Sequence, residues 1–215
     1  MLSLANYVFM GIAFLASLTA YFASNPYRYL RLFPFFLMIS GFIDTIGLLL
    51  SFKNQNNLIW YNLYMIFEFC FYFYILRETL YNKKIKNIVR IIPFLFVLFA
   101  AFNIIFIQRI TVFNTITYAL GALIIVATCV YFFFELFQLS YPVNIARLPA
   151  FWICAGLLFF YACTFPVFGL ANFMQSAPWV IIRNLKTIVN LLNIFLYSSF
   201  IIAFLCGIRV RNSTS

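Results

Sequence analysis

Seven apolar stretches follow one another along the chain, with only short polar connections between them. Each has about 18 residues or more, which is enough for a helix to cross the ~30 Å hydrocarbon core of a bilayer. We therefore expect an all-α fold with seven transmembrane helices. The predicted spans are approximately residues 4–22, 32–51, 57–76, 91–108, 112–137, 149–171 and 179–206.

Composition excludes a soluble domain. The chain is 66% hydrophobic and 8% charged, whereas a soluble domain usually carries about 25% charged residues. No polar stretch is long enough to form a second domain, so residues 1–215 should form one polytopic bundle. The first residues lack the basic start and small-residue cleavage site of a secretory signal, and we assign them to the first span.

The distribution of charge predicts the orientation in the membrane. The formal net charge is +10, from fourteen basic and four acidic residues. With the N-terminus outside, ten basic residues fall on the inner side and four on the outer side. The positive-inside bias then predicts an N-out, C-in topology, and it explains the charge without nucleic acid as a partner. The outer four are Lys53, Arg109, Arg183 and Lys186.

The longest connection is predicted to be a basic inner loop at residues 77–90. Its cationic side chains should hold anionic lipid headgroups, which gather at the cytoplasmic leaflet. Alternatively, the loop is a docking surface for a cytoplasmic partner. The residues expected to contact the headgroups are Lys83, Lys84, Lys86 and Arg90.

The residues needed for metal or hydrolytic chemistry are largely missing. The chain has no histidine, and its five cysteines lie inside apolar runs without metal-ligand spacing. We therefore expect no disulfide, no metal site and no cofactor. There is no GxSxG or HExxH motif, so an intramembrane enzyme would have only Asp44 and Glu68 as an acid–base pair, and we expect no enzyme.

A weak internal repeat relates the first three spans to the last three. The segment Arg31–Gly41 resembles Arg147–Gly156, and Asn62–Phe69 resembles Asn184–Leu191, which places Asn190 opposite Glu68. These matches suggest a parallel 3+1+3 duplication in which the fourth helix is the linker.

In span number, topology and repeat, the chain loosely resembles the seven-helix group that includes 3+1+3 sugar and vitamin transporters, opsins and receptors. The segments Asn62–Phe69 (NLYxxxEF) and Phe151–Tyr161 (FWxxxGLLxxY) are similar to those of uncharacterised small seven-helix bacterial proteins. This resemblance implies a multi-pass protein of the bacterial cytoplasmic membrane and implies no function. A retinal protein is disfavoured because Lys186 lies in the outer third of its span without a nearby acid.

Glu68 is placed near the middle of the third span. A carboxylate there costs about 2.5–3.5 kcal/mol on insertion scales, so it is rarely kept without a use. Helical spacing of three and four residues puts it on one polar and aromatic face. That face comprises Asn57, Tyr61, Tyr64, Glu68 and Tyr72.

Two other spans carry polar residues at a similar depth. Asp44 and Lys186 should lie about 10 Å below the outer surface, and Glu68 about 16 Å below it. Protonating a glutamate at pH 7 costs about 3.7 kcal/mol, so neutralising Glu68 is no cheaper than inserting it in its charged form. A better arrangement is an ion pair with Lys186 or Arg183, or a cavity that holds water. We expect a polar pocket that opens outward, with a closed, charge-paired latch as the alternative. The predicted ligand-binding residues are Asp44, Tyr61, Tyr64, Glu68, Arg183, Lys186, Asn190 and Asn193.

The remaining intramembrane acid, Glu135, is predicted to extend its carboxylate to the inner interface. The polar pocket favours transport of a small solute. Polar residues in the middle of the membrane are typical of transporters, and so are kinked helices, which Pro93 and Pro166 predict here. A small-ligand sensor that signals through residues 77–90 is the main alternative, and a structural membrane subunit is another.

Overall fold

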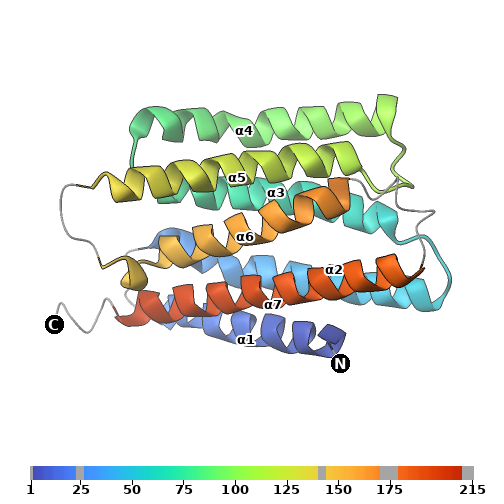
Figure 1. Ribbon diagram of the computed structural model, residues 1–215, viewed down its shortest axis with the longest axis horizontal. Helices are drawn as coiled ribbons and strands as arrows, with labels where there is room; N and C mark the ends of the chain where they lie inside the picture. Colours follow the sequence, from blue (N-terminus) through green and yellow to red (C-terminus); the bar gives the residue numbers. More distant parts are fainter. Residues whose placement is uncertain (1, 23–26, 140–143, 170–178, 210–215) are drawn as a thin grey trace.

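The computed structural model of the chain describes residues 2–22, 27–139, 144–169 and 179–209, and the side chains of 4–21, 27–139, 144–169 and 184–207. Over these residues it is all-helical, without a strand. Figure 1 shows the α-helices running side by side along the long axis of the molecule. They are α1 (Leu2–Phe22), α2 (Phe33–Phe52), α3 (Leu58–Thr79), α4 (Lys83–Phe102), α5 (Thr115–Phe137), α6 (Pro149–Gly169) and α7 (Trp179–Arg209).

Seven helices in the described ranges are long and apolar enough to cross a membrane. Their number agrees with the seven predicted spans and fits an integral membrane protein. Short helical segments extend three of them. A 3-10 turn, Arg28–Leu32, leads into α2, another, Ile145–Arg147, precedes α6, and a π-helical turn, Asn103–Ile107, ends α4. Orientation and the internal repeat stay predictions.

The predicted basic loop at residues 77–90 is wrong. Helix α3 continues to Thr79 and α4 begins at Lys83, so only residues 80–82 connect them. The Asn82 side chain caps α4 by accepting a hydrogen bond from the backbone N–H of Lys84, at 2.9 Å. Capping of this kind satisfies a backbone N–H that the first helical turn leaves unpaired. The basic residues therefore lie on helix ends that extend beyond the apolar run.

Lipid contact by these basic residues stays a prediction. Lys83, Lys84 and Arg90 are exposed on the first turns of α4. Lys86 forms a salt bridge with Glu78, in which its Nζ atom lies 3.7 Å from a carboxylate oxygen.

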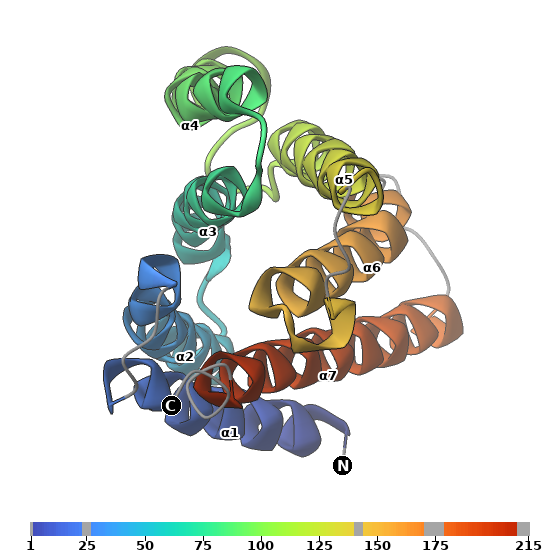
Figure 2. The ribbon, with the colours of Figure 1, turned by 90° about the vertical axis from the view of Figure 1, so that its left-hand side faces the viewer.

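Six helices form a closed ring in the order α1, α2, α3, α5, α6 and α7, with α7 returning to α1. Helix α4 lies outside this ring and packs mainly against α3 (Figure 2). Close approach within the ring depends on small residues. A Cβ atom at Gly156 of α6 would lie 2.8 Å from the Cβ atom of Ser199 in α7, and one at Gly121 of α5 would lie 2.7 Å from the ring of Phe69 in α3.

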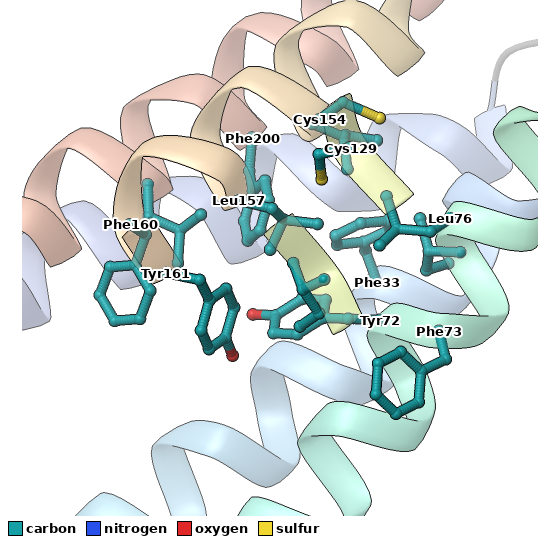
Figure 3. Close-up of a cluster of buried hydrophobic side chains, with 14 of the residues drawn as sticks. Phe33, Tyr72, Phe73, Leu76, Cys129, Cys154, Leu157, Phe160, Tyr161 and Phe200 are labelled. Atoms are coloured by element: carbon teal, nitrogen blue, oxygen red, sulfur yellow. The ribbon is translucent and has the colours of Figure 1, made fainter. Parts of the chain in front are cut away.

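One half of the ring is filled by buried hydrophobic side chains, many of them aromatic. Figure 3 shows part of this core, including Phe33 and Phe200. The Phe33 ring, at the start of α2, meets those of Phe71, Phe200 and Phe204 edge-on, with centroids 5.2–5.3 Å apart. Such edge-to-face pairs are a favoured aromatic arrangement. Phe33 contacts Phe71 in the second half of α3 and Phe200 and Phe204 in the second half of α7, so the packed half lies where α2 begins and toward the ends of α3 and α7. The other half of the ring contains the candidate site.

Candidate functional site

A cavity of about 400 Å³ lies inside the helix ring, and all six ring helices or their ends contribute to its wall. It occupies the half opposite the packed cluster, where α1 and α3 begin and α2 and α6 end. The lining residues are Asn6, Ser40, Asp44, Leu58, Tyr61, Tyr64, Met65, Glu68, Phe113, Tyr118, Phe160, Tyr161, Phe168, Val189, Asn193 and Tyr197.

Glu68 lies at the depth where the cavity meets the packed half. It is partly accessible although it sits in the middle of α3, because its side chain faces the cavity. The side chains of Tyr72 and Tyr161 approach its carboxylate, and in Figure 3 the Tyr72 hydroxyl points toward Tyr161. The Tyr161 hydroxyl is buried and makes no hydrogen bond of good geometry with a described residue.

Asp44 provides the second carboxylate of the cavity wall, one helix away from Glu68. The two carboxylates are close enough to repel one another electrostatically. Tyr7 and Tyr61 are also electrostatic neighbours of Asp44. Asp44 is partly exposed, so water in the cavity can reach it.

The ion pair between Lys186 and these acids, which the sequence offered as one alternative to a wet cavity, is not present among the described residues. In the described part of the chain, salt bridges join only Glu78 to Arg77 and Lys86, at 2.9 and 3.7 Å. Lys186 is exposed and does not line the cavity. Lys186 and Asn193 lie seven residues apart and share one face of α7, but the described α7 residues that line the cavity begin only at Val189.

Hydrogen bonds fix the polar wall on the α2 side. Ser40 donates to the Phe36 carbonyl at 2.8 Å, as a mid-helix serine often does, and shares a 2.6 Å hydrogen bond with the Tyr64 hydroxyl. Tyr61 packs directly over Gly47, where a Cβ atom would lie 2.6 Å from its Cζ atom. A side chain at Gly47 would therefore push the Tyr61 ring toward the cavity.

The structure brings five of the predicted ligand-binding residues to one cavity, and their role in binding stays a prediction. Asn190 does not line the cavity but accepts a 3.4 Å hydrogen bond from the lining residue Asn6. The side chain of Arg183 lies outside the described residues. The five that line the cavity are Asp44, Tyr61, Tyr64, Glu68 and Asn193.

Sequence reasoning missed several lining residues from α1, α5 and α6. Tyr118 and Tyr161 come from two helices that were not expected to face Glu68, and their ring centroids lie 6.2 Å apart. Tyr161 is the last residue of the FWxxxGLLxxY segment, which was its only signal in the sequence. Asn6 is the one amide in the first apolar run and could have been found for that reason.

A separate polar cluster fixes the connection between α4 and α5. The fully buried amide of Asn62 donates to the carbonyls of Ile110 and Val112, at 2.8 and 2.7 Å, and accepts from the backbone N–H of Asn114 at 3.1 Å. Asn103 donates to Thr117 at 2.9 Å. These bonds satisfy backbone groups of a tight connection, so the cluster has a structural role.

The Glu135 carboxylate reaches the connection between α3 and α4, and its position relative to the membrane interface stays a prediction. Glu135 is 9% exposed, and its two carboxylate oxygens accept hydrogen bonds from the backbone N–H groups of Tyr81 and Asn82, at 2.8 and 2.9 Å. These donors lie just before α4, where unpaired N–H groups favour a negative charge. The end of α5 is thereby tied to the start of α4.

The chain matches no protein-family model, no curated protein and no solved structure. The chemistry of the site therefore has to be read from its geometry. Across the described residues, no three Cys, Asp or Glu side chains come together in a way that would hold a metal ion. What the cavity offers is two carboxylates, several tyrosine hydroxyls and aromatic walls.

Proposed function

We propose that the protein binds a small solute in this cavity and transports it across the membrane. The observation that carries the proposal is the division of the helix ring. One half holds a cavity of about 400 Å³ with Glu68 at its base, and the other half is closed by packed aromatic rings. With the N-terminus outside, the cavity faces outward and the packed half closes the inner side.

Transport needs a second arrangement in which the packed half opens. Pro166 supports such a change, because a proline inside α6 removes one backbone hydrogen bond and allows the helix to bend there. The lining residues Tyr161 and Phe168 lie on the two sides of Pro166. Bending at this point would move one cavity wall relative to Glu68.

A ligand sensor is the second candidate, and the closed half is the observation that favours it. The rings of Phe33, Phe200 and Phe204 are at most 2% exposed. A sensor would keep this layer closed and pass a small shift of α7 or α3 to the inner ends of the helices. Both functions use the same cavity and differ in whether solute crosses.

Flux into proteoliposomes separates the two. We expect vesicles that contain the full chain to accumulate at least one member of a panel comprising glucose, alanine, acetate and phenylethylamine. Flux should fall at least tenfold in Glu68→Gln and stay unchanged in Glu78→Gln, which removes an acid outside the cavity. Binding of a panel member without flux would favour the sensor, and neither binding nor flux would favour a structural subunit.

A further inference from the structure

We propose that the ligand of the cavity is a small protonated primary amine with an apolar body. This inference deepens the proposed function, since it needs the cavity to be a binding site, but it does not need the solute to cross the membrane. Charge, ring chemistry and buried polar atoms of the wall support it independently.

The charge of the wall favours a cation. Its described residues include the acids Asp44 and Glu68 and no lysine or arginine. Neither acid forms a salt bridge within the described ranges. Two neighbouring carboxylates in an apolar bundle are costly without a compensating charge, and a bound cation would supply one. An anionic ligand would add to the repulsion.

The rings of the wall suit a cation that has an apolar body. Eight of the sixteen lining residues are aromatic, five of them tyrosines. A cation over a tyrosine or phenylalanine face is stabilised by the ring quadrupole, and the apolar part of the ligand can pack on neighbouring rings. The ring centroids of Tyr118 and Phe168 lie 5.0 Å apart, and those of Phe113 and Tyr118 lie 5.9 Å apart, so these rings form a continuous surface.

Buried polar atoms of lining residues favour an ammonium group with N–H donors. The Oδ1 atom of Asn6 is buried and has no hydrogen-bond donor among the described residues. The Tyr161 hydroxyl, on a side chain that is 1% exposed, approaches the Glu68 carboxylate. A primary ammonium carries three N–H donors, which can reach carboxylate, amide and hydroxyl oxygens together, whereas a quaternary ammonium has none.

The volume sets the size of the ligand. About 400 Å³ is the volume of roughly 13 water molecules at ~30 Å³ each. An amine with one ring or a short alkyl chain fits this space. A sugar of similar size would fit too, but it would leave both carboxylates without a counter-charge.

The inference is tested by binding, measured separately from flux. Isothermal titration calorimetry on the full chain in phosphatidylcholine nanodiscs at pH 7 would compare phenylethylamine with 2-phenylethanol and phenylacetate, with empty nanodiscs as the blank. We expect phenylethylamine to bind at least tenfold more tightly than the alcohol or the acid. Binding of the alcohol or the acid as tight as that of the amine, or no binding of the amine, would overturn the inference.

Three variants locate the binding. Asp44→Asn and Glu68→Gln should each weaken phenylethylamine binding at least tenfold, while the matched control Glu78→Gln stays within twofold of wild type. Unchanged affinity in both cavity variants would also overturn the inference. If a cavity variant does not fold, the inference is still tested by comparing the binding of phenylethylamine, 2-phenylethanol and phenylacetate to the wild-type chain.

The outcomes separate this inference from transport. Binding of phenylethylamine without flux of any solute would leave the amine site standing and contradict the transporter. Flux of glucose or acetate with no binding of the amine would leave the transporter standing and contradict the amine site.

Discussion

At the scale of single residues, Asn62 shows how this bundle uses a buried polar side chain. It is 0% exposed, lies on α3 and makes three hydrogen bonds to the backbone of the connection between α4 and α5. A buried polar side chain in an apolar ring of helices would be expected to mark a ligand site. Here all of its hydrogen-bonding partners come from the protein, so it holds a connection in place next to the cavity.

We expect Asn62→Ala to lower the free energy of unfolding by about 1–3 kcal/mol, because it leaves two carbonyls and one N–H group unpaired. The control Asn87→Ala, at an exposed position of α4, should change it by no more than about 0.5 kcal/mol. Thermal unfolding of the purified variants in the same detergent provides the measurement. Equal stability of the two variants would mean that water replaces the amide at little cost.

Unlike Asn62, the acids Asp44 and Glu68 line the cavity. Helical spacing predicted that Asp44, Glu68 and Lys186 share a depth band, and of these Asp44 and Glu68 line one cavity. The absence of an ion pair with Lys186 could not be predicted, because it depends on how α7 packs into the ring relative to α2 and α3. Tyr161 could not be predicted either, since its approach to Glu68 depends on how α6 closes the ring.

At the scale of helices, the spans could be predicted because bilayer thickness sets their length and apolar composition marks them. The start of α4 could not, because a run of charged residues is typical of a loop between two spans. Residues 83–90 are helical despite four basic side chains. The tie from Glu135 to the N–H groups of Tyr81 and Asn82 joins α5 to this start, and such a tertiary contact leaves no local signal.

Helix packing leads to a prediction at Gly156. The added Cβ atom of Gly156→Ala would lie 2.8 Å from the Cβ atom of Ser199 and 3.3 Å from a methyl group of Leu196. Helices α6 and α7 would have to separate, and we expect a loss of about 1–3 kcal/mol in the free energy of unfolding.

Gly11→Ala is the matched control for Gly156→Ala, because no heavy atom lies within 4 Å of its added Cβ atom. Alanine is the better helix former, so this variant should be as stable as wild type or more stable by up to about 1 kcal/mol. Unfolding midpoints of the two variants, compared under one set of conditions, measure the difference. A Gly156→Ala midpoint equal to that of Gly11→Ala would show that the α6–α7 contact has room to adjust.

At the scale of the whole molecule, the helix bundle has two chemically different ends. The end opposite the cavity carries the exposed side chains of Arg28, Lys83, Lys84, Arg90 and Arg147. The cavity end carries fewer cations, with Lys53 in the connection between α2 and α3. The positive-inside bias therefore predicts that the basic end faces the cytoplasm and that the cavity faces outward.

Cysteine labelling tests this orientation at two exposed positions. In intact cells, a maleimide that cannot cross the membrane should label Gln55→Cys, between α2 and α3, and should label Asn87→Cys only after permeabilisation. The unaltered chain is the control, because three of its own cysteines are partly exposed. The reverse labelling pattern would place the N-terminus inside and turn the cavity toward the cytoplasm. An amine bound at Asp44 and Glu68 would then be drawn from the cell interior, and the flux assay would have to be run with solute on that side.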